Sequence, residues 1–124
     1  ARRDNAQVLP TGETAANLLG LSTQVPMNYV YLTSGSARKI MVGKKTVTFK
    51  RCVPKNFACQ NEFLAVLIQA MKAIGQERLT DGHCVVIKGL LMKHLPIESL
   101  DADMKNAPLW VRRMVYNIIK EIGV

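Results

Sequence analysis

The residues with the clearest capacity for chemistry are seven lysines and arginines in a segment that lacks carboxylates. Between Thr14 and Asn61 the sequence contains no Asp or Glu. The chain of 124 residues has a formal net charge of +8, and nearly all of this excess lies in that segment. A positive field concentrated in this way suits a polyanion or an acidic protein surface. The seven cations are Arg38, Lys39, Lys44, Lys45, Lys50, Arg51 and Lys55.

The start of this basic segment contains a run of small residues, Ser34-Gly35-Ser36. Free backbone amides of small residues beside cations such as Arg38 and Lys39 can form an anion nest. An ordinary turn between two strands would use the same residue types. Both interpretations stay open at the level of sequence.

Nucleophilic catalysis has one nominal set of residues, in which Ser22 would act with His83 or His94 and with Asp81. A catalytic triad is defined by geometry, and Ser22 lacks the G-x-S-x-G context of a nucleophile elbow. We interpret Ser22 as a loop residue whose hydroxyl makes local hydrogen bonds.

Metal chemistry has two candidate sets, neither with a typical spacing. Zinc would need Cys52, Cys59, His83 and Cys84, but these form no short C-x-x-C knuckle, and free cysteines often pack as small hydrophobic residues. A metal-dependent nuclease needs converging carboxylates. The expected strands have none, and Asp101-Ala102-Asp103 is interpreted as a solvated segment. We therefore expect no cofactor and no enzymatic activity.

The basic segment is expected to lie on strands. Residues 28–33 have the composition of a strand, and residues 39–42 and 45–50 form a hairpin around Gly43-Lys44. In this register Ile40 pairs with Val47 and Met41 with Thr46. Alternation then places one face towards the core (Ile40, Val42, Val47 and Phe49) and makes the other a basic, hydroxyl-rich outer face (Lys39, Met41, Thr46, Thr48 and Lys50). Since Phe49 should point into the core, base stacking receives little support.

Helices are expected before and after the strands in the sequence. Residues 12–19 form a short helix ended by Gly20, and residues 63–74 form a central buried helix capped by Asn61. Further helices are expected from Thr80 or Asp81 to Pro96, around 99–105, and from Pro108 onwards. The predicted fold is a single α+β domain over residues 1–124, in which four to five helices pack on one face of a small, mostly antiparallel three-stranded sheet.

The sequence has no apolar run of about 18 residues and does not open with the apolar region of a signal peptide. Its three cysteines, at irregular spacing, are a poor disulfide framework. We therefore expect a cytoplasmic protein with no membrane partner.

Four segments form a recognisable pattern: the helix–loop–strand run Pro10 to Pro26, Tyr31 to Gly35, Arg38-Lys39-Ile40 and Asn106 to Val111. These segments resemble the C-terminal region of AbiEi-type antitoxins, the bacterial proteins of type IV toxin–antitoxin systems that act in phage defence. The resemblance covers most of the chain.

The resemblance implies an antitoxin and transcriptional autoregulator that counters a nucleotidyltransferase-type toxin of the same operon. Such proteins typically carry a promoter-binding winged helix-turn-helix before this region. The chain opens at Ala1-Arg2-Arg3 without it, so we interpret the chain as a fragment or a separate domain. No catalytic residue and no DNA-reading element are carried over. The expected function is a non-catalytic binding domain; the alternative is a DNA- or RNA-binding module that uses the basic hairpin.

Overall fold

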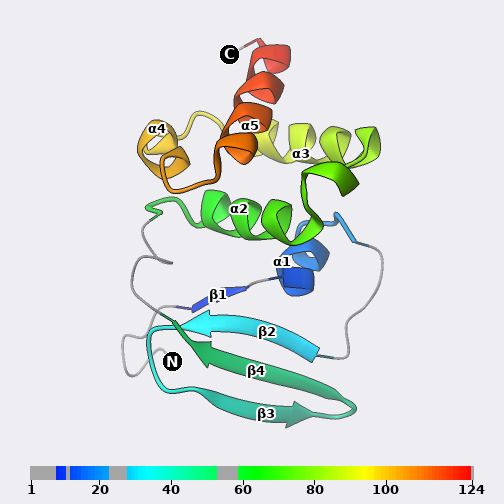
Figure 1. Cartoon of the computed structure of the whole chain (residues 1–124), viewed down its shortest axis with the longest axis vertical. Coiled ribbons are helices and arrows are strands. Elements are labelled where there is room, and N and C mark those ends of the chain that lie inside the picture. Colours follow the sequence, from blue (N-terminus) through cyan, green and yellow to red (C-terminus); the bar gives the residue numbers. More distant parts are fainter. Residues whose placement is uncertain (1–7, 11, 23–27, 53–58, 124) are drawn as a thin grey trace.

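The computed structural model describes residues 8–10, 12–22, 28–52 and 59–123. It is an α+β protein in which a four-stranded sheet lies at one end and the helices at the other (Figure 1). Helix α2 lies between the sheet end and the remaining C-terminal helices. The elements are β1 (Val8–Pro10), α1 (Gly12–Leu18), β2 (Asn28–Thr33), β3 (Arg38–Val42), β4 (Lys45–Arg51), α2 (Glu62–Ile74), the short 3₁₀ helix η3 (Gln76–Arg78), α3 (Asp81–His94), α4 (Leu100–Met104) and α5 (Leu109–Ile122).

The central helix α2 is confirmed at both ends. The side chain of Asn61 accepts a hydrogen bond from the backbone N–H of Leu64, and Gly75 ends the helix with a φ of 88° that favours glycine. Leu64, Leu67 and Met71 are fully buried. The helix is apolar over most of its surface because it packs against α1 and β1 as well as α4 and α5.

Helix α3 begins with a capping box. The hydroxyl of Thr80 accepts from the N–H of His83, and the ring of His83 accepts from the N–H of Thr80. This identifies Thr80, rather than Asp81, as the cap. Pro108 is the N-cap of α5, so this helix begins at Leu109, one residue later than predicted. None of the described helices has the length and apolar character needed to cross a lipid bilayer.

The sheet differs from the prediction in strand number and in direction. It has four strands in the order β1-β2-β4-β3, and β4 pairs with β2 in parallel. The chain leaves β2, passes the end of the sheet to the outermost strand β3, and returns through Gly43-Lys44 to insert β4 between them. The predicted hairpin register is confirmed, with Ile40 opposite Val47 and Met41 opposite Thr46.

The helices contact the sheet mainly at β1 and β2, and not across a whole face as predicted. The backbone N–H of Val30 donates to the buried Thr14 Oγ1 at 2.8 Å. Helix α1 thus provides a hydrogen-bond acceptor for the edge of β2 beyond the end of the short strand β1. The outer hairpin of β3 and β4 therefore projects from the helical part of the molecule (Figure 1).

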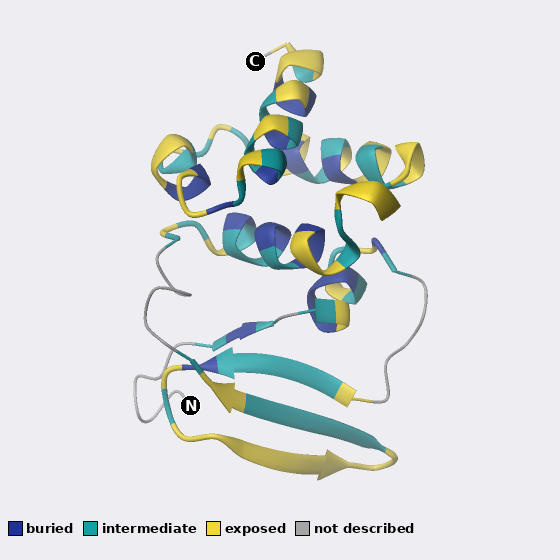
Figure 2. Cartoon of the chain, in the orientation of Figure 1, coloured by how far each residue is buried: buried dark blue, intermediate teal, exposed yellow. Residues whose placement is uncertain are grey.

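This projection overturns the predicted burial of the hairpin. Every residue of β3 is exposed (Figure 2), including Ile40 and Val42, which were expected to face the core. Val42 keeps 60% of its surface exposed, because β3 is the outermost strand and no helix packs on it within the described residues.

A buried carboxylate fastens the segment before α2 to α4. Asp103 is only 1% exposed, so its interpretation as part of a solvated segment is wrong. Its oxygens accept from the backbone N–H groups of Gln60 and Asn61 and from Ser99 Oγ, at 2.7 to 2.9 Å. Burial favours the neutral acid, but the hydrogen bonds from Gln60, Ser99 and Asn61 outweigh this effect and lower the pKa of Asp103.

Candidate nucleic-acid interface

The strand alternation distributes the basic residues over both faces of the sheet. Tyr29 and Tyr31 of β2 are register partners of Val47 and Phe49 of β4, so their side chains share one face with that of Phe49. The same register places three cations on this side of the sheet, which we call the aromatic face. The aromatic and basic side chains on it are Tyr29, Tyr31, Phe49, Arg38, Lys45 and Arg51.

A row of three side chains crosses the aromatic face from β2 to β3. The rings of Tyr31 and Phe49 are stacked, with centroids 5.8 Å apart and planes inclined by 24°. On the other side, Arg38 Cζ lies 5.6 Å from the centroid of the Phe49 ring. The row therefore runs ring, ring and guanidinium, with the Phe49 ring enclosed between Tyr31 and Arg38.

A second cation–aromatic pair lies towards the tip of the hairpin. Lys45 Nζ is 5.4 Å from the ring centroid of Tyr29 and 3.3 Å from its hydroxyl oxygen. Lys45 is half-buried while its neighbour Lys44, in the turn, is exposed. The contact with Tyr29 fixes one ammonium group beside the aromatic row.

The expectation that Phe49 points into the core is wrong. Phe49 is half-buried, and its described ring contacts are Tyr31 and Arg38 on the sheet surface. Tyr29 and Tyr31 were not among the predicted site residues. The period-2 pattern of residues 28–33 contained the signal, but their shared face with Phe49 depends on the parallel pairing of β2 with β4, which the sequence does not display.

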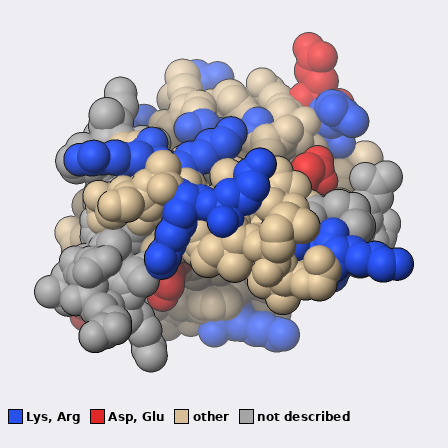
Figure 3. Space-filling view, turned by 90° about the horizontal axis from the view of Figure 1, so that it is seen from below, with Lys and Arg blue, Asp and Glu red and all other residues tan. Residues whose placement is uncertain are grey.

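The six described cations of the hairpin are not neutralised by neighbours. In the part of the chain that the structure describes, none of them lies within salt-bridge distance of a carboxylate, and the ion pair found there joins Lys88 to Glu121 on the helices. Viewed from the sheet end, Lys and Arg side chains spread over this part of the surface, with few acidic groups between them (Figure 3). The hairpin thus presents an unscreened positive field.

The opposite face carries the remaining strand cations. Lys39 and Lys50 lie there with the hydroxyl residues Thr46 and Thr48, as predicted, and Thr48 Oγ1 donates to Asn28 Oδ1 at 3.0 Å. No aromatic residue of the described strands lies on this face. Lys55 falls outside the described residues.

The predicted anion nest loses one of its donors. The N–H of Gly35 donates to Thr33 Oγ1 at 3.0 Å, which makes this segment a side-chain-stabilised turn after β2. Gly35 is also not among the described glycines with positive φ, the conformation that alternates with a right-handed residue in a nest. Ser34 and Ser36 are exposed at the surface of this turn.

The nominal triad is not assembled. Ser22 and His83 line one cavity of about 280 Å³ with Glu13, but Ser22 Oγ donates to Glu13 Oε2 at 3.5 Å. His83 Nδ1 accepts from the N–H of Thr80, and no hydrogen bond joins Ser22 to His83 within the described residues. Asp81 lines a different cavity. His94 lies near the sheet, stacked on Phe63.

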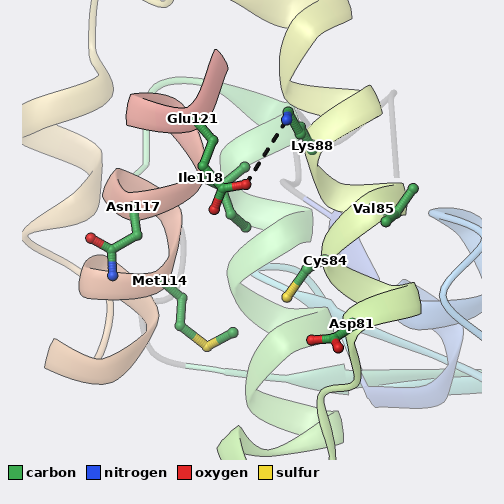
Figure 4. Close-up of a pocket in the computed structure, with 8 residues that line it drawn as sticks. All are labelled: Asp81, Cys84, Val85, Lys88, Met114, Asn117, Ile118 and Glu121. Atoms are coloured by element: carbon green, nitrogen blue, oxygen red, sulfur yellow. Dashed lines mark ion pairs between the residues drawn. The ribbon is translucent and has the colours of Figure 1, made fainter. Parts of the chain in front are cut away.

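That other cavity, of about 400 Å³, lies between α3 and α5 (Figure 4). It contains the Lys88–Glu121 ion pair and the thiol of Cys84. Burial, and then the carboxylates of Asp81 and Glu121, raise the pKa of the Cys84 thiol, which favours the protonated form and not a nucleophilic thiolate.

The residues of the zinc alternative are not brought together. Cys59 contacts the backbone oxygen of Asp103, whereas Cys84 lies in the groove between α3 and α5. No cluster of three His, Cys, Asp or Glu side chains close enough to share a metal ion occurs among the described residues.

Comparison with known proteins gives one match. The family described as "Family of unknown function (DUF6088)" matches residues 1–100. No curated protein and no solved structure matches the chain. The matched part includes the whole sheet and the helices α1, α2 and α3, and hence every residue of the aromatic face. The chain therefore belongs to the DUF6088 family.

Proposed function

We propose that this protein is a non-enzymatic binder of single-stranded nucleic acid and that the aromatic face is its binding surface. The observation that carries the proposal is the row of Tyr31, Phe49 and Arg38 on the open sheet. Unpaired bases stack on aromatic rings and guanidinium groups, and the two ends of this row are the Tyr31 ring and the Arg38 guanidinium, held in place by Phe49 between them.

The charge distribution supports the same ligand. Arg38, Lys45 and Arg51 flank the rings, and no carboxylate lies within salt-bridge distance of them in the described part of the chain. Binding of such cations to phosphates is favourable because it releases the counterions that are condensed on the nucleic acid. Base stacking and phosphate contact are thus provided on one surface by neighbouring strands.

A single strand suits this surface better than a duplex. In a duplex the flat faces of the bases are already stacked on one another, so rings on a sheet cannot reach them.

The proposal is tested by fluorescence anisotropy with labelled single strands and with the duplex of the same sequence, over a series of salt concentrations. We expect the single strand to bind more tightly. The slope of log K against log salt should be about −0.7 for each phosphate contacted. Equal or tighter binding of the duplex, or a slope near zero, contradicts the proposal.

We also propose, on a separate basis, that the protein acts as an antitoxin against a nucleotidyltransferase-type toxin of the same operon. The support is the resemblance of residues 10–26 and 106–111 to AbiEi-type antitoxins. Binding to the RNA on which such a toxin acts would join the two proposals. The test is co-expression with a neighbouring nucleotidyltransferase gene, and failure of the full-length protein to restore growth would refute the antitoxin role.

A further inference from the structure

A cavity of about 570 Å³ lies where the aromatic face meets the helices. Its walls include Pro10 and Tyr31 from the sheet and Phe63, Val66, Leu90 and His94 from α2 and α3. The cavity is mostly apolar, and it is large enough for a planar heterocycle with its sugar.

The helical wall of this cavity is a stacked pair of rings. The rings of Phe63 and His94 have centroids 3.9 Å apart and planes inclined by only 6°. His94 Nδ1 lies 2.8 Å from the carbonyl oxygen of Leu90. A carbonyl oxygen can only accept, so Nδ1 carries the hydrogen, and Nε2 of the neutral imidazole is left as an acceptor.

The charge of the described lining favours a base over a phosphate. The exposed Glu62 is one of the described residues that line the cavity, and no Lys or Arg is among those described residues. A phosphate would be repelled by Glu62, whereas a ring with N–H groups would find acceptors in Glu62 and in His94 Nε2.

The cavity is continuous with the aromatic face through one residue. Tyr31 stacks on Phe49 in the row on the sheet and also lines the cavity, and its register partner Pro10 lines it as well. A strand that crosses the sheet from Arg38 over Phe49 to Tyr31 is thereby led to the opening of the cavity.

We propose that this cavity binds one guanine base of the strand held on the aromatic face. The inference rests on the proposed function and adds a base preference to it. Guanine is the base whose Watson–Crick edge presents two adjacent N–H donors, which match the two oxygens of the Glu62 carboxylate. Adenine and cytosine place a ring acceptor beside their amino group, and uracil has a single N–H between two carbonyl oxygens.

The test compares oligouridine of about eight nucleotides, a length within the range of single-strand sites, with the same strand carrying one guanosine at its 5′ or its 3′ end. We expect the guanosine to tighten binding about tenfold in one of the two positions, as for a bidentate base contact. Adenosine or cytidine at that position should not. Glu62→Gln should abolish the preference and leave the affinity for oligouridine unchanged or slightly increased.

The matched control is Glu98→Gln, which removes the same charge from an exposed position outside the cavity and should retain the guanosine preference. A second measurement does not depend on strand binding. Titration with guanosine monophosphate should shift the imidazole NMR signal of His94, and adenosine monophosphate should shift it much less.

The possible failures are distinguishable. If oligouridine binds but all four terminal bases bind equally, the cavity inference is overturned and the proposed function stands. If no single strand binds, the proposed function is overturned, and the mononucleotide titration then decides the cavity alone. An unchanged His94 signal with guanosine monophosphate would overturn the guanine site in either case.

Discussion

Arg38 lies over the ring of Phe49, with its guanidinium carbon 5.6 Å from the ring centroid. The two residues are register partners on β3 and β4, so the hairpin itself positions them. On its other side Phe49 stacks on Tyr31, which belongs to a strand reached only through the parallel pairing. The local hairpin thus sets the contact of Arg38 with Phe49, and the long-range pairing of β2 with β4 sets the contact of Phe49 with Tyr31.

Replacing Arg38 by Gln should weaken single-strand binding and make the salt slope less steep by about 0.7 if Arg38 contacts one phosphate. Lys39→Gln is the matched control, since the adjacent residue loses the same charge on the opposite face of the same exposed strand. Salt-dependent anisotropy measures both. Equal effects of the two variants would show that a diffuse charge, and not the aromatic face, holds the strand.

Replacing Phe49 by Leu should weaken single-strand binding, because the ring that holds Tyr31 and Arg38 in one row is lost while an apolar side chain remains. The salt slope should stay as in the wild type, since no phosphate contact is removed. Duplex binding should be unaffected. A variant that loses affinity only through a changed slope would contradict a stacking role for Phe49.

Thr14→Val should destabilise the protein by about 1–3 kcal/mol. The N–H of the half-buried Val30 then loses its acceptor, the hydroxyl of the buried Thr14, while the volume of the side chain is nearly kept. Thermal or urea unfolding measures the loss. Hydrogen exchange should accelerate at the Val30 amide, and unchanged protection there would mean that this hydrogen bond does not hold the sheet to α1.

Asp103→Asn should destabilise the protein and alter its pH dependence. Because the folded state lowers the pKa of Asp103, this carboxylate stabilises the fold above its unfolded pKa of about 3.9. That contribution is lost as the pH falls from about 5 through the lowered folded-state value.

Urea unfolding at a series of pH values checks this sign. The wild type should lose more stability than Asp103→Asn on acidification across that window. The exposed Asp101 is not a suitable control, since it accepts a hydrogen bond from the hydroxyl of Tyr116. Asp81→Asn, at the exposed start of α3, is preferable, although a modest loss from the helix dipole is expected there.

The parts of the fold that depend on local sequence were predictable. Asn61 and Thr80 cap their helices, Gly75 ends α2, and Gly43-Lys44 fixes the hairpin register. Each of these depends on groups a few residues apart. The α+β class followed from the order of the elements.

The errors concern partners that are distant in sequence. The three residues of β1 are too few, with a proline at the end, to give a strand pattern. The insertion of β4 between β2 and β3 cannot be read from alternation, which assigns faces but not neighbours. The same gap explains the candidate site: the cations were identified, but Phe49 was assigned to the core and the rings beside it were missed. Asp103 was taken as solvated because its two backbone donors, the N–H groups of Gln60 and Asn61, lie more than 40 residues earlier in the chain.

Because β3 is exposed along its whole length, its five side chains contribute little to the free energy of folding. Substitutions there should have small effects on whether the protein folds. The buried residues that stabilise the fold lie mainly in the helices and in β1. Variants of the outermost strand can therefore be screened for binding on an unchanged scaffold.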